Sequence, residues 1–527
     1  MDDQLAVADD FRTGWIRRLA PFLKISAACG AAGYILMFIV LALRRMAYPF
    51  ELEWMEGLSV DHVQRVLDGL PLYVPPSVDF VPSIYTPLYY YVAAIPAAVL
   101  GNGFVPVRLI SFLASLGSMA LLFVYVRKEA KDNFAGLIAA GLYASTYYLT
   151  GAWLDIARVD ALFVFFLLLA VGALRFHPTR TGWILAALLT TLAFLTKQTG
   201  LLAALFFMIY AVTAHRKHGL YYIAAFVLFT GTAVLGMDWL HHGWFNFYVF
   251  EVPAGHPIET LQFLKFFAQD TLRPMPLASL FILTYLLIRW LKGERQDIAF
   301  YVLVGMGFLA AAGAPRVKAG NYVNDLIPAY AFLAMVFGIS IPALRNWYGN
   351  LFAALPASFP DRARIGHGLS GLFYALIAVQ LIIMVYGPTN QIPTPADRAT
   401  GTELIHTFAA FKGDVWVVHH GYMSVQSGKR SHSMSQPFND VLCAGNPQAN
   451  KLLLDDLNRA LQNHRFAAIV TDTDEDSVAA YCQRAGYICE PISYADEQDG
   501  WPISGYPTRP SKIYLPQEPS LADRTAP

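Results

Sequence analysis

The sequence of 527 residues is poor in charge and in cysteine. Only 14% of the residues are charged, and 38 basic residues balance 38 acidic ones, so the formal net charge is zero. This balance offers a nucleic acid no electrostatic attraction and argues against a nucleic-acid-binding protein. Four cysteines are too few for a disulfide scaffold. The sequence also lacks a glycine-rich phosphate-binding loop and a nucleophile elbow.

Hydrophobic residues, in contrast, are abundant. They make up 56% of the chain, and the mean hydropathy of +0.42 exceeds what a soluble fold of this size could bury. We therefore predict a polytopic α-helical membrane protein with about eleven transmembrane helices. Several are nearer fifteen residues than the usual ~20, so we expect tilted or partly re-entrant helices. The segments lie near 25–43, 105–126, 134–152, 159–175, 182–196, 199–214, 220–239, 276–290, 298–313, 326–344 and 368–387.

The distribution of basic residues predicts the orientation. The first apolar segment follows Arg12, Arg17, Arg18 and Lys24 of residues 1–24 and is not followed by a small-residue cleavage site, as in a signal anchor. Lysine and arginine then collect in alternate loops, which the positive-inside rule places in the cytoplasm with the N-terminus. We expect a multi-pass protein of the inner (plasma) membrane. The outer segments are then 44–104, 153–158, 240–275, 314–325, the turn at Lys197 and everything after 388.

The apolar segment 84–100 does not fit this alternation if it crosses the bilayer. We interpret it as a helix at the outer interface, anchored by Tyr85, Tyr89, Tyr90 and Tyr91. A true span with a further re-entrant segment remains the alternative. The sequence alone leaves this choice open.

The chain turns polar after Pro388. Short strand-like runs at 415–418 and 467–470 alternate with helical ones such as 450–463, which predicts a small extracytoplasmic α/β domain over 391–515. Residues 516–527 read as a disordered tail. Cys482 and Cys489 could form a disulfide in an oxidising compartment or remain two buried thiols.

Three carboxylates lie close together in the first outer loop, at Glu51, Glu53 and Glu56. A carboxylate beside the outer membrane surface can accept a proton from a hydroxyl group, or hold a divalent cation against a phosphate. The alternative is an amphipathic interfacial helix whose acids only face water.

A second cluster, Asp155, Arg158 and Asp160, falls at the same predicted membrane face. The two acids could complete a metal or acceptor site, and the guanidinium could bind a phosphate. Simple capping of helix ends is the alternative. The histidines of 240–275 and of the C-terminal region show no spacing typical of metal ligands.

Four basic residues lie in short outer segments, against the positive-inside bias, and together they favour an anionic ligand. Each of them alone could equally extend to lipid headgroups. They are Arg108, Lys197, Arg316 and Lys318.

The order of these features resembles the GT-C superfamily of membrane glycosyltransferases. The nearest branch is the bacterial one with protein mannosyltransferase-like enzymes and the aminoarabinose and galacturonic acid transferases of lipopolysaccharide. The resemblance covers most of residues 25–390. It depends on the acidic loop ELEWMEG at 51–57, LDGLPLY at 67–73 followed by YTPLYY at 85–90, Arg108 opening the next span, and an Asp after the third span followed by the Thr-Lys turn at Lys197.

The resemblance implies a GT-C-like transmembrane domain over 25–390 and a specific reaction. A hexosyl or pentosyl group would pass, with inversion, from a polyprenyl-phosphate donor to an envelope lipid, glycan or protein on the extracytoplasmic face. Glu53 would be the base, with Glu51 and Glu56 as alternates and Asp155 or Asp160 as a second acid. A divalent cation, Mg²⁺ or Mn²⁺, would fall to Glu53 and Asp155 if the enzyme needs one. The donor phosphate would be bound by residues among Arg108, Arg158, Lys197, Arg316 and Lys318.

The chain departs from the family pattern at two positions. It carries Glu in the first loop where relatives often carry Asp, and Thr86 where the aminoarabinose enzyme has a lysine. A transporter or flippase of a lipid-linked anion, or an inactive scaffold of the same fold, is the competing hypothesis. A transporter predicts related halves or a charge cluster at the bilayer midplane, and the sequence shows neither. The sugar, the acceptor and the oligomeric state stay open.

Overall fold

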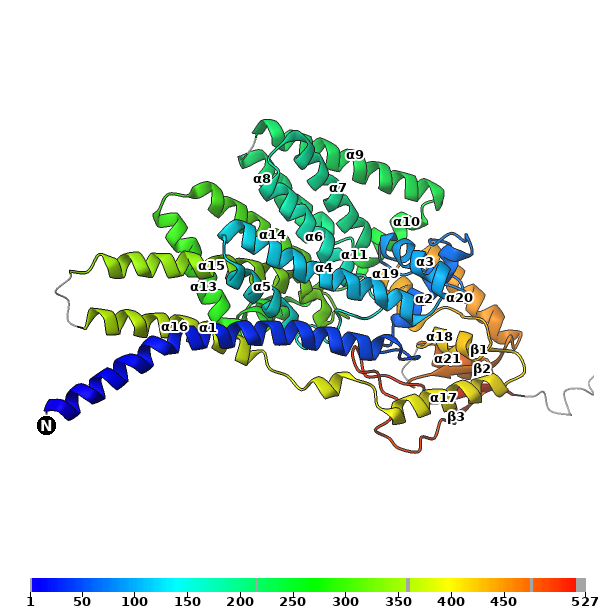
Figure 1. Ribbon diagram of the computed structural model, residues 1–527. Helices are drawn as coiled ribbons and strands as arrows, with labels where there is room; N and C mark the ends of the chain where they lie inside the picture. The colour runs from blue at the N-terminus through cyan, green and yellow to red at the C-terminus, as the bar shows by residue number, and fades with distance from the viewer. Residues whose placement is uncertain (1, 215, 357–360, 474–476, 518–527) are drawn as a thin grey trace, which may run out of the picture.

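Long apolar helices form a bundle in the structure, a computed structural model that describes all residues except 1, 215, 357–360, 474–476 and 518–527 (Figure 1). Each apolar segment predicted to span the membrane overlaps one of these helices. The bundle consists of α1 (Asp2–Met46), α4 (Phe104–Ala130), α5 (Asn133–Ser145), α6 (Asp160–Phe176), α7 (Arg180–Thr196), α8 (Gly200–Ala214), α9 (Arg216–Leu240), α13 (Pro276–Leu291), α14 (Arg295–Arg316), α15 (Ile327–Ala353) and α16 (Arg362–Ile383).

Judged by length and composition, fewer helices can span a membrane than the eleven predicted from the sequence. Within the described residues, 6 helices are long and apolar enough to cross a membrane, or 7 if 260–272 and 276–291, bent by 92°, count as one span. Helices such as α5 and α8 have 13 and 15 residues, which at 1.5 Å per residue are shorter than a ~30 Å hydrocarbon core. The structure therefore supports six or seven of the predicted spans.

The segment between α1 and α4 lies at one end of the bundle and contains α2 (Glu56–Leu67) and α3 (Leu88–Leu100) (Figure 1). The tyrosines predicted to anchor α3 at an interface mostly face the protein. Tyr89 and Tyr90 are buried, and the Tyr89 hydroxyl donates to the carbonyl of Val107 at 3.0 Å. Only Tyr91 is exposed, because successive residues of a helix point in different directions and three of the four meet packed neighbours.

The loop between α9 and α13 is built of short helical pieces. These are α10 (Trp244–Asn246), the π-helical η1 (Phe247–Glu251), α11 (Val252–Gly255), α12 (Thr260–Lys265) and the π-helical η2 (Phe266–Leu272). The 3₁₀ turn η3 (Val323–Leu326) lies between α14 and α15 in the chain.

The C-terminal unit is a small mixed α/β structure that follows the 3₁₀ turn η4 (Pro388–Gln391). Its four strands lie in the order β1-β2-β4-β3; β1 and β2 are parallel and the other pairs antiparallel. The elements are α17 (Pro395–Ala410), β1 (Asp414–Val417), α18 (Gly421–Gln426), α19 (Ser435–Ala444), α20 (Pro447–Gln462), β2 (Phe466–Thr471), α21 (Ser477–Arg484), β3 (Tyr487–Pro491) and β4 (Lys512–Pro516).

The periodicity of α20 explains how the C-terminal unit holds together. Leu453, Leu457 and Leu461 recur every four residues, so they share one helix face and pack in the same core as Trp416 and Ile469 of the sheet. Both predicted strands and the predicted helix are confirmed. Cys482 and Cys489 are free in the structure. Of the predicted tail, residues 518–527 lie outside the described residues, and Pro516 still belongs to β4.

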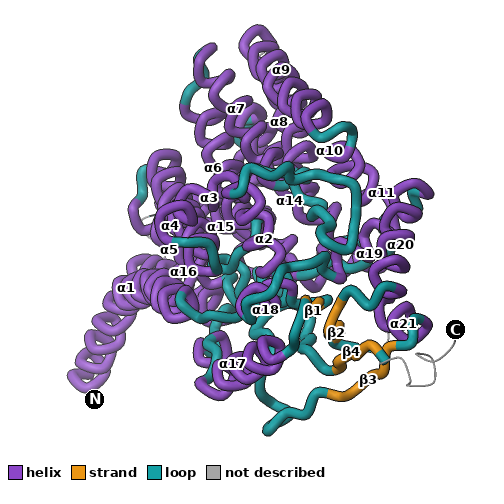
Figure 2. The backbone as a smooth tube through the Cα atoms, turned by 90° about the vertical axis from the view of Figure 1, so that its right-hand side faces the viewer, coloured by secondary structure: helices purple, strands orange, loops and turns teal. Residues whose placement is uncertain are grey.

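The C-terminal unit contacts the first loop. Viewed from the end of the molecule that carries the sheet, α18 lies beside α2 and α19 beside α11 (Figure 2). The contact is close: a Cβ added to Gly255 of α11 would lie 2.9 Å from the Cα of Ala444 of α19. The loops of the bundle and the C-terminal unit therefore enclose a shared space.

Candidate active site

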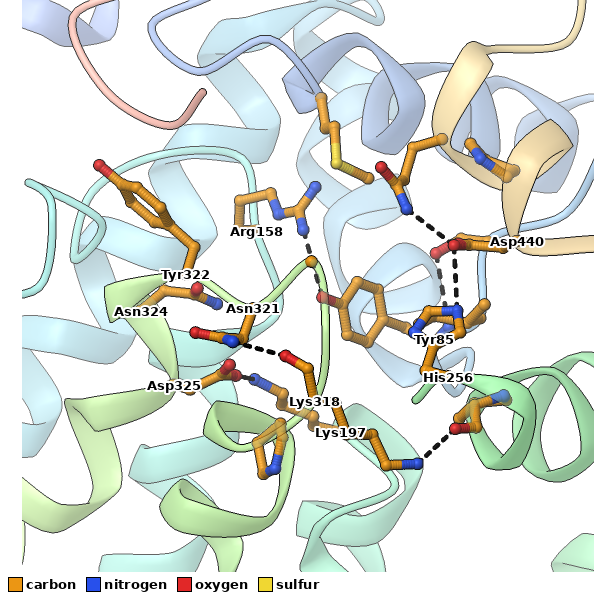
Figure 3. A pocket seen from close by; sticks show the side chains of 18 of the residues that line it. Tyr85, Arg158, Lys197, His256, Lys318, Asn321, Tyr322, Asn324, Asp325 and Asp440 are labelled. Carbon is orange, nitrogen blue, oxygen red and sulfur yellow. Dashed lines mark hydrogen bonds and ion pairs between the residues drawn. The ribbon is translucent and has the colours of Figure 1, made fainter. Parts of the chain in front are cut away.

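A cavity of about 800 Å³ opens where the first loop, the bundle and the C-terminal unit meet. We call it the central cavity. One wall comes from α8 and η1 and is apolar, with Leu201, Leu202, Val249 and Phe250. The rest of the lining combines small and aliphatic residues with aromatic and polar ones (Figure 3). The aromatic and polar ones include Glu53, Trp54, Tyr85, Trp153, Arg158, Lys197, Lys318 and Tyr506. A largely apolar pocket with a few convergent polar groups is typical of a ligand site.

Glu53 is the only one of the three first-loop acids among the residues that line the central cavity in the described chain. Its side chain is 1% exposed, and its Oε2 lies 3.7 Å from Nη1 of Arg158 without accepting a hydrogen bond from any described residue. Burial raises the pKa of Glu53 to about 8, although the positive charge of Arg158 opposes the shift. A carboxyl group with a pKa near neutrality and a free oxygen can serve as a general base.

Glu56 is fully engaged with Arg108. The Arg108 Nη2 and Nε donate to the two carboxylate oxygens at 2.6 and 2.9 Å, and both side chains are completely buried. The backbone amides of Leu52 and Ala157, each at 2.7 Å, donate to the same carboxylate. Burial alone would raise the pKa of Glu56, but the guanidinium of Arg108 outweighs it and holds the pKa below its ordinary value. The pair joins the first loop, α4 and the 153–160 segment, and does not line the cavity.

Glu51 points toward the C-terminal unit. Its Oε2 forms a hydrogen bond with Nδ1 of His420, and its Oε1 accepts from the amide of Gly57 at 3.1 Å. On the other side of the imidazole, Nε2 of His420 lies 2.9 Å from Oδ2 of Asp472. All three side chains are buried.

The acids of the second cluster pair with different cations. Asp155 lies 3.4 Å from Nε of Arg45 and accepts from the Tyr147 hydroxyl at 3.0 Å. Asp160 accepts from Nζ of Lys197 at 2.7 Å and from the indole of Trp153 at 2.9 Å. Neither of these two acids lines the central cavity.

Three of the five predicted phosphate-binding cations line the central cavity: Arg158, Lys197 and Lys318. Figure 3 shows Arg158 beside the Tyr85 hydroxyl, to which it donates at 3.2 Å, and Lys197 beside Asp325, whose carboxylate lies 2.9 Å from its Nζ. Lys318 donates to the carbonyl of Pro253 and forms no ion pair with a described residue.

The other two predicted cations lie away from the cavity wall. Arg108 is held by Glu56, and Arg316 donates from Nε to Asp270 at 2.9 Å. The structure thus separates the three candidate phosphate-binding cations that line the cavity from the two that do not, a distinction that the sequence could not make.

The residues present do not fit a divalent cation. No group of three or more His, Cys, Asp or Glu side chains that could hold a metal ion occurs in the described part of the chain. Glu53 and Asp155, the two ligands that the sequence had offered, each face an arginine rather than each other's oxygens. Each of these two carboxyl groups therefore has a cationic neighbour where a metal site would need further oxygen ligands.

The sequence did not predict the positions of several residues at the site. Tyr85 was predicted as an interface anchor, yet its ring lines the central cavity. His420 meets Glu51 across 369 positions of sequence and Asp472 across 52, and Tyr506 reaches the cavity from the loop before β4. Covariation between distant positions in an alignment of homologues is the signal that predicts such contacts.

Comparison with known proteins identifies the fold. Residues 82–236 match a family model described as dolichyl-phosphate-mannose-protein mannosyltransferase. A crystal structure of ArnT from Cupriavidus metallidurans bound to undecaprenyl phosphate aligns over 95% of this chain and 98% of that chain, with 13% sequence identity and a TM-score of 0.57. Its apo state aligns over 92% and 98%, with 12% identity and a TM-score of 0.56.

No curated protein sequence matched the chain. The two structural alignments and the family match nevertheless confirm the resemblance that the acidic loop, the tyrosine-rich segment and the Thr-Lys turn predicted. The protein has the fold of these ArnT structures, and its residues 82–236 match the family model described as dolichyl-phosphate-mannose-protein mannosyltransferase.

Proposed function

We propose that the protein transfers a hexosyl or pentosyl group from a polyprenyl-phosphate donor to a hydroxyl group of an envelope lipid, glycan or protein. The observation that carries the proposal is the position of Glu53, a buried carboxyl with a free oxygen in a cavity that also contains three cations. Base and cations are the two kinds of group that this reaction needs. The fold and the family match point to the same class of reaction.

Each wall of the central cavity has a part in this proposal. The apolar side chains of α8 and η1 line the cavity, and the first isoprene units of a membrane-embedded donor would lie against them. Arg158, Lys197 and Lys318 would then face the phosphate, since charge-assisted hydrogen bonds to phosphate oxygens are strong. Undecaprenyl phosphate in the related ArnT structure is a ligand of this chemical class.

The reaction would proceed by direct displacement. The acceptor hydroxyl oxygen forms a bond to the anomeric carbon, and the bond from that carbon to the phosphate oxygen breaks with its electron pair remaining on the phosphate. Glu53 accepts the hydroxyl proton, and the cations stabilise the additional negative charge of the leaving phosphate. Displacement from one side inverts the anomeric configuration.

Arg158 would act on both the proposed base and the donor phosphate. It lies between the base and the proposed phosphate position and lowers the pKa of Glu53 toward neutrality, against the effect of burial. It therefore keeps a fraction of Glu53 ionised at physiological pH. Glu51, Glu56, Asp155 and Asp160 hold the surrounding loops in this proposal and do not touch substrate.

The proposed side of the membrane is the extracytoplasmic one, with the N-terminus in the cytoplasm. The first loop and the C-terminal unit lie at the same end of the bundle (Figure 1), which agrees with the alternation of basic loops. On that side nucleotide sugars are not available, so the donor must already be attached to a lipid.

Mass spectrometry of envelope glycans and lipid-linked sugars tests the proposal. A deletion strain is complemented with wild type, with Glu53→Gln, or with Glu403→Gln, which changes an exposed carboxylate on α17. We expect one sugar to be missing and a polyprenyl-linked donor to accumulate, with rescue by wild type and Glu403→Gln only. Unchanged glycans in the deletion strain would refute the transferase, and rescue by Glu53→Gln would refute the base.

A further inference from the structure

The backbone of the Glu53 loop is held by the C-terminal unit. The amide of Ser504 donates to the carbonyl of Leu52 at 3.0 Å, and Glu53 and Ser504 pair as an isolated parallel bridge. The Ser504 hydroxyl also donates to the carbonyl of Gly151 in the turn after α5. One residue near the end of the chain therefore connects the loop of the proposed base to the bundle.

Gly505 packs directly on the Glu53 side chain. A Cβ at this position would lie 2.8 Å from Cγ and 2.9 Å from Oε1 of Glu53, closer than atoms in contact can be. Its φ of +81° is also in the left-handed region that favours glycine. Glycine is therefore required at 505 for two independent reasons, and its backbone limits the rotamers open to Glu53.

His420 holds the same loop at Glu51, two residues before Glu53. Each ring nitrogen faces a carboxylate, Nδ1 facing Glu51 and Nε2 facing Asp472, so the imidazole donates on both sides only when it is protonated. Burial alone would lower the pKa of His420, but Asp472 and Glu51 outweigh it and raise the pKa to about 10. The hydroxyl of Thr508 also donates to Asp472.

The sheet explains why His420 is held firmly. β1 and β2 are parallel neighbours, so their carboxyl ends meet at one edge. His420 follows the end of β1 by three residues, and Asp472 directly follows the end of β2. The pair is thus attached to the most regular part of the C-terminal unit.

We propose that the C-terminal unit is part of the catalytic machinery, with His420, Asp472 and Gly505 as positioning residues for Glu53. The proposal rests on the function proposed above. The unit holds the loop at residue 51 by a charged hydrogen bond, at residue 52 by a backbone hydrogen bond and at residue 53 by direct packing. Three consecutive residues held by the C-terminal unit define the direction of the carboxylate that must meet the acceptor hydroxyl.

The test compares purified full-length variants in turnover of the lipid-linked sugar that accumulates in the deletion strain. His420→Gln and Gly505→Ala are expected to lower kcat about tenfold to a hundredfold while the donor KM changes less than threefold, because a misplaced base affects the transition state more than donor binding. The matched control is Leu457→Ala, which weakens the core of the C-terminal unit away from the loop.

A merely structural role for His420 predicts a different result. In that case His420→Gln loses activity only in proportion to its unfolded fraction, as Leu457→Ala does. Equal kcat per folded molecule for the two variants would overturn the proposal. So would a His420→Gln variant whose kcat stays within twofold of an active wild type.

Hydrogen exchange supplies a readout that needs no substrate and is independent of the transferase hypothesis. The amides of 51–57 are expected to exchange at least tenfold faster in His420→Gln than in wild type, with α4 and α15 unchanged. Leu457→Ala should leave exchange at 51–57 unaltered. Unchanged protection of 51–57 in His420→Gln refutes the positioning role, whereas an inactive wild type with the expected exchange pattern refutes only the proposed reaction.

Discussion

Replacing Glu53 by glutamine should remove activity while preserving or raising stability. The amide has nearly the same shape as the carboxylic acid, so the packing against Gly505 is retained, but it cannot accept the acceptor proton. General base catalysis contributes roughly 10²–10⁴-fold to rate, and we expect kcat to fall by that factor. Donor binding should change little because Arg158, Lys197 and Lys318 remain.

The effect on stability follows from the raised pKa. The folded protein holds the Glu53 proton up to about pH 8, whereas the unfolded chain releases it near the ordinary value of 4.5. The folded state therefore binds more protons between these values, and wild-type stability falls as pH rises from 4.5 to 8. At about 1.4 kcal/mol per pH unit, retaining the Glu53 proton in the folded state costs roughly 3 kcal/mol of stability by pH 7.

Thermal unfolding midpoints of wild type and Glu53→Gln, measured in one detergent from pH 5 to pH 8, check this reasoning. The two midpoints should nearly coincide at pH 5, and the variant should become the more stable protein as pH rises. A variant that is less stable than wild type at pH 8 would show that the carboxylate is stabilised in the folded state. That result would contradict both the raised pKa and the free oxygen.

Four further substitutions test individual contacts. Arg158→Gln removes the charge that lowers the pKa of Glu53, so the rising limb of the pH–rate profile should move to more alkaline pH; an unmoved limb contradicts the contact. Lys197→Met leaves two buried carboxylates without their shared cation and should cost about 3–5 kcal/mol, seen as a lower unfolding midpoint. Arg108→Leu should cost a similar amount for the same reason, and a folded but inactive variant would instead place Arg108 in the reaction. Lys318→Ala should raise the donor KM at least tenfold without lowering the midpoint, since this lysine makes no ion pair with a described residue.

Local sequence patterns were sufficient to predict the helices of the bundle. Apolar residues extend through each of them, and neither packing nor a distant contact is needed to recognise such a segment. The strands at 415–418 and 467–470 were equally recognisable as short β-branched and aromatic runs. Fewer helices than the predicted eleven are long and apolar enough to cross a membrane in the described residues, because hydropathy does not measure whether a helix of 13 to 17 residues is long enough.

The sequence predicted the candidate residues of the site but not their contacts. All ten candidate residues could be selected by their charge near the predicted outer membrane face, because an ionisable group close to a membrane is energetically costly and is usually functional. The sequence could not assign partners to them. Glu51, Glu53 and Glu56 lie within six positions, yet they face the C-terminal unit, the central cavity and Arg108 respectively.

Composition and the order of charged loops were therefore enough to predict a membrane-embedded helical protein, the end of the bundle that carries the candidate site and the superfamily that the chain resembles. Tertiary structure alone decided which acid faces the cavity, because a hydrogen bond or ion pair forms wherever folding brings two groups together, whatever their distance in sequence. It also decided the contact of Glu51 with His420, 369 positions away. The C-terminal α/β unit, which the sequence predicted only as a small separate domain, forms one wall of the central cavity.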